Sequence, residues 1–367
     1  MSSADYPLRQ CGIYRNLPNF DPSICNLNAI ITGSNGISGF ATLRALLDAP
    51  KGWSTIYSLS RSGLSSEQLD LIPESLRSHI KEISVDLTRP SQEIATILQK
   101  AGFKADYVFF YAYLQPKTGD SGMSTKMADA LADINVPMFK NFLDSLEIAN
   151  VEPKRILLQT GGKNYGLHIG RCRAPLVESD PKPRHLQTNF YYSQEDLLFE
   201  YCKKHPQTGW NVDGATITWD RFFNELARWY GVESGVVNPD HDTSKFKIIE
   251  FTGGKDSPLR YGPPAALRIK FRIAEWFKQP ENRVAWEQIM AESAGQVKLN
   301  VFDDPAMETV ISEFDYARRA NLSMNKVRRS GFNGFVDTLE SLFEMFQETV
   351  EFGALPRMKV SNADPLI

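Results

Sequence analysis

The chain has 367 residues, of which 42% are hydrophobic and 23% charged, so it is long enough to bury a sizeable core in one large or two smaller domains. Its 41 basic and 44 acidic residues give a net charge of −3 without long blocks of one sign, which argues against nucleic-acid binding and against a polybasic membrane patch. Four cysteines and five histidines without metal-ligand spacing, and no apolar run of spanning length, lead us to expect a soluble cytoplasmic protein without a metal.

Residues 1–27 are polar and irregular, and we expect them to form an arm that leads into the first domain. A short apolar run, Ala29 to Ile31, follows the arm and is typical of a buried parallel strand. An amphipathic segment from Phe40 to Leu47 predicts a helix shortly after it. The connection between strand and helix therefore decides what this unit can bind.

That connection contains three glycines at G-x-x-G-x-x-G spacing. Such glycines permit a tight turn and a close approach of the backbone, while a helix N-terminus offers N–H groups to a diphosphate. Glycines also mark ordinary strand-to-helix turns, which is the alternative. We predict a dinucleotide site formed by Thr32, Gly33, Gly36, Ile37 and Gly39.

The second strand is expected from Ser54 to Ser60, and Arg61 and Ser62 follow it at once. In this arrangement the end of the second strand faces the adenosine ribose, where an acidic residue favours NADH and an arginine accommodates a 2′-phosphate. Because no acidic residue stands there, we predict NADPH as the cofactor. The alternative is a solvated arginine in a loop.

A helical stretch from Ser65 to Ser78 and a third strand from Glu82 to Val85 lead to Asp86 and Leu87, which we expect to border the adenine. A fourth strand is predicted from Tyr107 to Tyr113, a long helix from Lys126 to Glu147 and a fifth strand from Arg155 to Gln159. Strands alternating with helices predict an α/β protein with a Rossmann-type, doubly wound parallel sheet.

Polar side chains gather after the fifth strand. Lys163 and Tyr165 lie in the loop that follows it, and Tyr191 and Tyr192 begin a later helix. A tyrosine beside a lysine is a recurring acid in carbonyl chemistry, because the ammonium stabilises phenolate character while the phenol hydrogen-bonds the substrate oxygen. Tyr113, at the carboxyl edge of the fourth strand, and Tyr165 are the expected wall of the substrate pocket.

Four segments carry more specific motifs: Ile31-Thr-Gly-Ser-Asn-Gly-Ile-Ser-Gly39, Leu158-Gln-Thr-Gly-Gly-Lys-Asn-Tyr165, Asn189-Phe-Tyr-Tyr-x-x-Glu-Asp196 and Leu322-Ser-Met-Asn-Lys-x-x-x-x-Gly-Phe-x-Gly-Phe335. Together they resemble the progesterone 5β-reductase/iridoid synthase-like family, an atypical branch of the extended short-chain dehydrogenases. The resemblance runs from about Asn28 to Pro356. Ordinary short-chain dehydrogenases carry Tyr-x-x-x-Lys instead, whereas here Glu195 stands four residues after Tyr191.

The resemblance implies NADPH-dependent 1,4-reduction of a C=C bond conjugated to a carbonyl. It implies that Tyr191 holds the enolate oxygen with support from Lys163, that Arg61 and Ser62 contact the 2′-phosphate, and that Asp86 and Leu87 border the adenine. The fourth strand departs from the plant members, which carry Val-Thr-Trp where this chain has Tyr-Ala-Tyr113. Plant steroid or monoterpenoid substrates are therefore not expected to carry over.

A larger departure follows Trp210, where Asn211-Val-Asp-Gly214 joins directly and dozens of family residues are absent, including an inner strand of the sheet. We expect an arm (1–27), an NADP-binding domain (28–210), a mainly helical C-terminal cap (211–356) and a tail (357–367). The cap helices are predicted at Phe222 to Tyr230, Ala265 to Phe277, Arg283 to Glu292 and Phe335 to Thr349.

The sequence thus predicts an NADPH-dependent enone or enal reductase acting on a hydrophobic small molecule, with a homodimer as the expected oligomer if one forms. Simple carbonyl reduction with the same tyrosine and lysine stays open as an alternative. A non-catalytic Rossmann protein that binds nucleotide is the other, because the loss of a buried strand would damage the nicotinamide half of the site before the adenine half.

Overall fold

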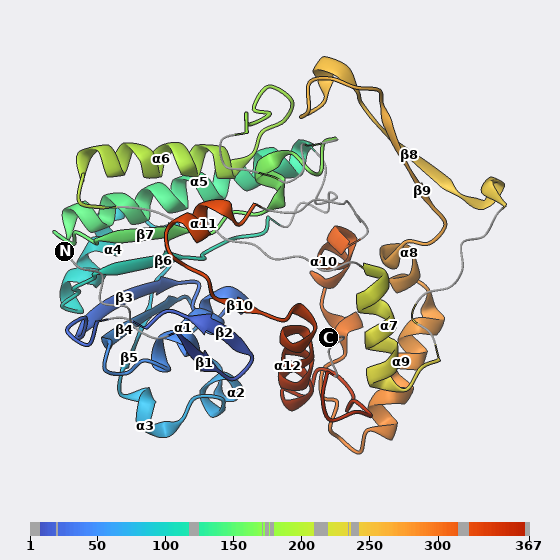
Figure 1. The fold of residues 1–367 in the computed structure, drawn as a ribbon, viewed down its shortest axis with the longest axis horizontal. Coiled ribbons are helices and arrows are strands. Elements are labelled where there is room, and N and C mark those ends of the chain that lie inside the picture. The colour runs from blue at the N-terminus through green and yellow to red at the C-terminus, as the bar shows by residue number, and fades with distance from the viewer. Residues whose placement is uncertain are drawn as a thin grey trace.

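The computed structural model describes residues 8–19, 21–116, 125–170, 172, 176, 180–208, 219–233, 235, 242–314 and 323–363. Its centre is a five-stranded parallel sheet in the order β5-β4-β3-β6-β7 (Figure 1). The strands are β3 (Leu27–Thr32), β4 (Trp53–Ser60), β5 (Ile80–Ser84), β6 (Tyr107–Phe110) and β7 (Arg155–Leu158). This confirms the predicted Rossmann-type sheet, and β6 ends three residues before the predicted Tyr113.

Alternation along β3 explains how the sheet is covered on both faces. Ala29 and Ile31 pack with Phe40 and Leu43 of α1 (Ile37–Leu47) in one core cluster. Ile30 belongs to the cluster on the opposite face, with side chains of α4 (Ser91–Lys100), α5 (Thr125–Ile148) and α6 (Phe190–Lys204). The carboxyl ends of all five strands therefore meet at one edge, between two helical layers.

Two helical segments differ from the sequence-based expectation. The helix predicted from Ser65 to Ser78 is divided into α2 (Ser66–Asp70) and α3 (Glu74–Arg77), because Pro73 between them is extended and lacks an N–H. Helix α4 was not predicted, although Ile94 and Leu98 follow Pro90 at helical spacing and are completely buried.

The N-terminal arm is not irregular where the structure describes it. It contains β1 (Arg9–Cys11) and β2 (Tyr14–Leu17), and β2 pairs antiparallel with β10 (Phe335–Val336) from the far end of the chain. Strands this short need a partner to persist. The partner lies more than 300 positions away, so local pattern could not reveal it.

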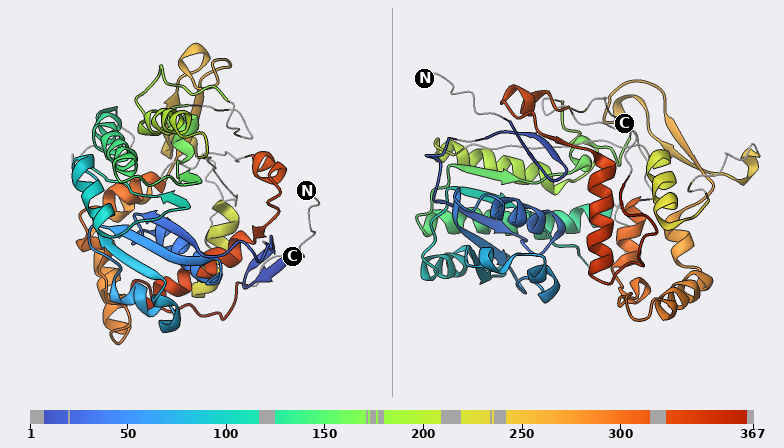
Figure 2. Two further views of the ribbon diagram at one scale, coloured as in Figure 1. Left: turned by 90° about the vertical axis from the view of Figure 1, so that its left-hand side faces the viewer. Right: turned by 60° about the horizontal axis from the view of Figure 1, so that its bottom comes forward.

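The C-terminal part contains six helices in its described residues: α7 (Trp219–Tyr230), α8 (Ile273–Phe277), α9 (Pro280–Glu292), α10 (Met307–Phe314), α11 (Asn325–Arg329) and α12 (Thr338–Glu351). Short 3₁₀ turns accompany them: η2 (Thr243–Lys245), η3 (Gly254–Asp256) and η4 (Val301–Asp303), with η1 (Gly162–Tyr165) after β7. Trp229 of α7 is completely buried against Leu339 and Phe343 of α12, which gives this part its own core. Figure 2 shows α12 between this part and the parallel sheet.

The helix predicted from Ala265 to Phe277 is wrong in its first half. β9 (Ala265–Ile269) pairs antiparallel with β8 (Lys247–Phe251), and only α8 is helical. The two strands form a ribbon that extends away from the other elements (Figures 1 and 2). Apolar side chains in so short a run fit a strand and a helix equally, and the partner strand decides between them.

Candidate active site

The turn between β3 and α1 is built so closely that side chains are excluded from it. Gly33 has a φ of 64°, and a Cβ on Gly39 would stand 2.2 Å from the Gly33 carbonyl oxygen. The Gly33 N–H donates to the Leu59 carbonyl at 2.9 Å, which fixes the turn to the end of β4. No described side chain caps α1 and its first turn has no acidic residue, so the predicted diphosphate position is free of competing negative charge.

The predicted adenosine residues come together beside this turn. A cavity of about 130 Å³ has Gly33, Arg61, Ser62, Asp86 and Leu87 in its lining. The Asn35 amide donates to the Ser62 hydroxyl at 3.0 Å, so the glycine turn and the end of β4 hold each other. Hydrogen bonds from the Thr88 hydroxyl and N–H hold the pKa of Asp86 below its usual range. The lining of this adenosine cavity fits the adenosine end of a dinucleotide, with Arg61 exposed at its rim.

Thr32 and Ile37, also predicted cofactor residues, occupy different positions in this turn. The Thr32 hydroxyl accepts the backbone N–H groups of Tyr111 and Ala112, each at 3.2 Å, and so holds the chain leaving β6 against β3. Ile37, in the first turn of α1, is 89% exposed. Thr32 therefore fixes the backbone of Tyr111 and Ala112, two residues that line a second, larger cavity, while Ile37 is exposed and lines neither cavity.

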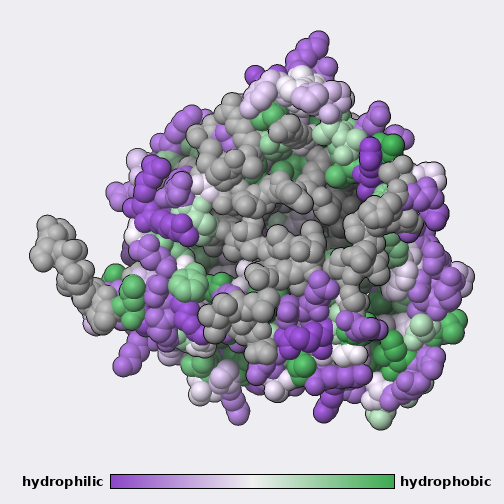
Figure 3. Space-filling model, turned by 45° about the vertical axis from the view of Figure 1, so that its right-hand side comes forward, coloured by the Kyte–Doolittle hydropathy of each residue, from purple (hydrophilic) through white to green (hydrophobic). Residues whose placement is uncertain are grey.

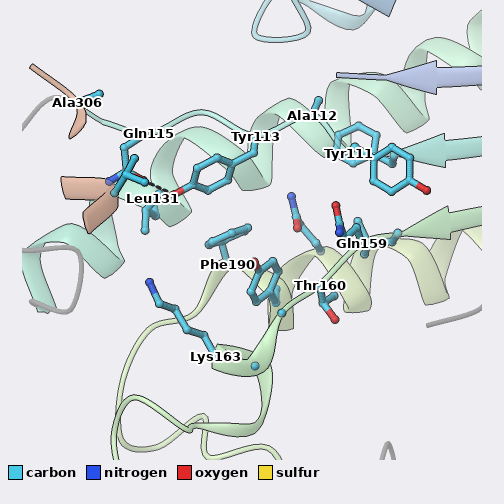
Figure 4. A pocket seen from close by; sticks show the side chains of 17 residues that line it. Tyr111, Ala112, Tyr113, Gln115, Leu131, Gln159, Thr160, Lys163, Phe190 and Ala306 are labelled. Atoms are coloured by element: carbon cyan, nitrogen blue, oxygen red, sulfur yellow. Dashed lines mark hydrogen bonds between the residues drawn. The ribbon is translucent and has the colours of Figure 1, made fainter. Parts of the chain in front are cut away.

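A larger cavity of about 740 Å³ opens at the carboxyl ends of β6 and β7. Its lining is mainly apolar and aromatic and includes Phe110, Tyr113, Leu131, Leu158, Phe190 and, from α10, Val310. In Figure 4 Lys163 extends from η1 toward the space that the Tyr113 and Phe190 rings border. Ala112 and Tyr113 line both this cavity and the adenosine cavity, so the two are neighbours along one groove.

Lys163 and Tyr191 both line the large cavity, from η1 and α6 respectively. One side chain ties their positions together: Asn189 Oδ1 accepts the Tyr191 N–H at 3.1 Å, and Asn189 Nδ2 donates to the Lys163 carbonyl at 2.8 Å. The Tyr191 hydroxyl lies against the loop after β7, because a Cβ on Gly161 would stand 3.2 Å from it. A phenol and an ammonium are thus presented to one apolar space.

Tyr192 and Tyr165 lie elsewhere. Tyr192 is 3% exposed on the core side of α6, and burial raises its pKa to about 12. Tyr165, expected at the substrate pocket, lines a separate cavity of about 40 Å³, with the Lys182 ammonium 5.1 Å from its ring centre. Successive residues of a 3₁₀ turn rotate by a third of a circle, so Tyr165 cannot share the direction of Lys163.

Three residues of the site were not predicted from the sequence. Gln159 lines the large cavity, and its amide donates to the Ser38 hydroxyl of α1 at 3.0 Å. Gln194, 2% exposed, lines the same cavity and donates to the Asn135 carbonyl at 3.0 Å. The Phe190 ring packs at a tilt against the Tyr191 ring, with ring centres 4.2 Å apart. Only the position of Gln159 directly after a strand could have indicated a role.

The join of Trp210 to Asn211 lies outside the described residues. The described sheet is unevenly covered at β6 and β7: Val108 and Ile156 are buried on the face of α5, whereas Phe109 and Leu157 on the face of α1 are only partly buried. Within the described residues β7 pairs with β6 alone. Among the described residues this half of the sheet therefore has β7 at its edge and a face that is only partly covered.

No protein-family model matches the chain. A short chain dehydrogenase, gsfE, of Penicillium aethiopicum is 24% identical over 394 aligned positions, covering 90% of this chain and 99% of that protein. An (S)-8-oxocitronellyl enol synthase of Nepeta racemosa is 28% identical over 191 positions, covering 50% of this chain and 44% of that protein. A solved UDP-Glc/GlcNAc 4-epimerase of Campylobacter jejuni has a TM-score of 0.41 at 17% identity, covering 51% and 52% of the two chains.

The fold, the glycine turn and the similarity to the Penicillium and Nepeta proteins support an oxidoreductase of the short-chain dehydrogenase/reductase superfamily with a nicotinamide cofactor. Among the described residues, no cluster of three or more His, Cys, Asp or Glu side chains could hold a metal ion. None of the described helices is both long and apolar enough to cross a membrane.

Proposed function

We propose that the protein is an NADPH-dependent reductase of the C=C bond of a hydrophobic enone or enal. One observation carries this proposal: the adenosine cavity and the large apolar cavity share Ala112 and Tyr113, so a dinucleotide lying from Arg61 past the glycine turn leads toward Lys163 and Tyr191. The similarity to a protein named (S)-8-oxocitronellyl enol synthase supports the same chemistry.

The cofactor would lie with its 2′-phosphate at Arg61 and Ser62 and its diphosphate at the N-terminus of α1, and when bound it supplies hydride. Addition of hydride to the β-carbon of an enone moves an electron pair onto the carbonyl oxygen. Tyr191 donates a hydrogen bond to that oxygen, and the Lys163 ammonium stabilises its negative charge. A proton from solvent then completes the reaction at the α-carbon.

Two features of the large cavity support a hydrophobic substrate. Its volume of about 740 Å³ lies in the range of small-molecule sites, and its lining is apolar apart from a few convergent polar groups. Tyr113 and Phe190, with ring centres 5.9 Å apart, offer flat apolar surfaces to a planar conjugated system.

Steady-state assays with a panel of cyclic and acyclic enones and enals, using NADPH and NADH in parallel, test the proposal. With 4-deuterated NADPH we expect deuterium at the β-carbon of a saturated carbonyl product. Deuterium at the carbonyl carbon of an alcohol would replace the proposal by 1,2-carbonyl reduction. Cofactor binding without turnover of any panel member would indicate a non-catalytic nucleotide-binding protein.

A further inference from the structure

Glu195 lies four residues after Tyr191, and residues at this spacing share one face of a helix. Its Oε1 accepts the Asn164 amide at 2.7 Å and the Lys182 ammonium at 3.2 Å. Glu195 and Lys182 side chains are each only 17% exposed. A carboxylate with so little exposed surface holds its hydrogen-bond partners more firmly than an exposed carboxylate does.

Asn164 is the residue directly after Lys163, and it is 2% exposed. Its Oδ1 is buried without a hydrogen-bond partner among the described residues, so the Nδ2 bond to Glu195 fixes the orientation of its amide. Without that acceptor the whole side-chain amide would be buried unpaired, which is costly. The bond to Glu195 therefore holds the side-chain amide of Asn164 in its orientation.

The last three residues of η1 are each held by a side chain from outside the turn. The Lys163 carbonyl accepts from Asn189 at 2.8 Å, Asn164 donates to Glu195, and the Tyr165 ring receives the Lys182 ammonium, which itself binds Glu195. Glu195 contacts two of these three connections. Asn189 and Glu195 therefore attach the 3₁₀ turn that carries Lys163 to the helix that carries Tyr191, and Glu195 makes the connection to Asn164 and Lys182.

We propose that Glu195 is a positioning residue, which locks η1 onto α6 and so fixes the Lys163 side chain relative to Tyr191 in the large cavity. The effect of Glu195 on catalysis rests on the proposed function. The attachment of η1 to α6 does not, because it is a property of the folded chain. Glu195 contacts neither cavity space nor reacting atoms. It acts through Asn164 and Lys182.

Its neighbour Asp196 provides a matched control. Asp196 forms a two-pronged ion pair with Arg184, at 2.8 and 2.9 Å, but the two side chains are 56% and 46% exposed and the pair makes no contact with η1 in the described residues. Asp196→Ala therefore removes the same charge from the same helix, one position along, without touching the link to Lys163.

Amide hydrogen exchange of the full-length chain, resolved by mass spectrometry over 161–167, measures the attachment without turnover. The Asn164 and Gly166 amides donate to Gly161 and Lys163 carbonyls at 2.8 and 3.0 Å and report on the turn. We expect Glu195→Ala to speed their exchange by about tenfold or more, the equivalent of losing one hydrogen bond to a charged group. Glu195→Gln, which keeps an acceptor oxygen for Asn164, should restore most of the protection. Equal exchange in Glu195→Ala and Asp196→Ala would overturn the proposal.

Asn164→Ala removes the donor of the same hydrogen bond. It tests whether this bond holds η1 in place even if Glu195→Ala does not fold. We expect it to loosen the turn as Glu195→Ala does, and the double variant to be no looser than either single variant. Additive effects would mean that the two residues act separately, which contradicts the proposal.

The catalytic consequence is measured separately. Glu195→Ala should lower kcat by about tenfold while leaving the Kd of NADPH within about twofold, because the adenosine cavity is not touched. If the wild-type chain reduces no enone, the proposed function fails, yet the exchange measurement still decides whether Glu195 holds the turn.

Discussion

Gly39 lies directly against the carbonyl of Gly33, so that a Cβ on Gly39 would stand 2.2 Å from that oxygen and 2.8 Å from the Cα of Ser34. Both of these are backbone atoms, which cannot move to a new rotamer as the end of a flexible side chain can. Gly39→Ala should therefore move α1 away from the turn, lowering both the melting temperature and the affinity for adenine dinucleotides.

The measurements are a thermal melt and a fluorescence titration with NADPH. Gly52→Ala is the control, because its Cβ would lie 3.2 Å from a single carbonyl oxygen of Ala49, outside the glycine turn. Gly39→Ala with unaltered binding would mean that the turn takes no part in holding the diphosphate.

Arg61 stands exposed at the end of β4, next to Ser62, whose hydroxyl is fixed by Asn35. An arginine–phosphate pair is charge-assisted and can be bidentate. Arg61→Ala should therefore weaken NADPH binding by at least about tenfold while changing NADH binding little. Arg155→Ala, at the opposite end of the sheet, should leave both unchanged. Equal losses for the two cofactors in Arg61→Ala would contradict the assignment of the 2′-phosphate.

Local pattern predicted the sheet well, because its strands are apolar and each is bounded by turn residues or helices. The parallel pairing agrees with the right-handed crossovers expected between such strands, whereas the order β5-β4-β3-β6-β7 comes from the structure. Elements with distant partners could not be predicted in this way. β2 depends on β10, and β9 depends on β8, so the side chains of Ala265 to Ile269 alone do not distinguish strand from helix.

For the site, motif and resemblance predicted that Lys163 and Tyr191 act together, and the structure places both at one cavity. The sequence could not predict that Lys163 and Tyr165 point in different directions, because this depends on the 3₁₀ turn that contains them both. Gln194 and Asn189 act through hydrogen bonds to backbone carbonyls, and a sequence gives no sign of which carbonyl a side chain reaches.

Tyr191→Phe removes the hydroxyl of a tyrosine that lines the large cavity, and Lys163→Ala removes the ammonium group of a lysine that lines it. Loss of one such donor typically costs about 10²–10³ in rate. We expect kcat to fall to this degree in either variant while NADPH affinity remains close to that of the wild type. Tyr192→Phe is the matched control, because Tyr192 is 3% exposed and does not line the cavity. Full turnover in Tyr191→Phe, with Tyr192→Phe inactive, would mean that the other tyrosine holds the substrate oxygen.

Helix α12 carries Glu340, Glu344 and Glu348 at four-residue spacing, facing the arm and α1. Partial burial, and then the charges of Glu348 and Glu340, raise the pKa of Glu344 above its usual range. A carboxyl whose pKa is raised in the folded state stabilises the folded protein only while it is protonated. This stabilisation is fully present below pH 4.5 and is lost as the pH rises through the raised pKa of Glu344.

Glu344→Gln should therefore melt at a higher temperature than the wild type at neutral pH, and the difference should disappear as the pH falls below 4.5. Glu250→Gln, an exposed carboxyl on β8, controls for the general effect of removing one negative charge. An unchanged melting temperature at neutral pH would mean that the three glutamates do not repel one another measurably.

The half of the sheet formed by β6 and β7 is only partly covered in the described residues. The alignment with the Penicillium dehydrogenase spans 394 positions but covers only 90% of this 367-residue chain, so it includes positions at which this chain has no residue. Phe109 and Leu157 are only partly buried, and β7 has one partner in the described residues. A parallel sheet is normally covered on both faces, and an exposed edge strand is a site that proteins usually protect.

We therefore expect this chain to bind NADPH measurably but to reduce enones slowly, because a displacement of about 1 Å at the nicotinamide can cost about 10²-fold in rate. A version carrying the segment that follows the corresponding position in the Penicillium relative, inserted after Trp210, should melt at a higher temperature and turn over faster at unchanged NADPH affinity. An insertion of equal length rich in Gly and Ser is the control, since it cannot form a buried strand. Rapid enone reduction and a cooperative melt of the 367-residue chain itself would show that its own residues complete the sheet.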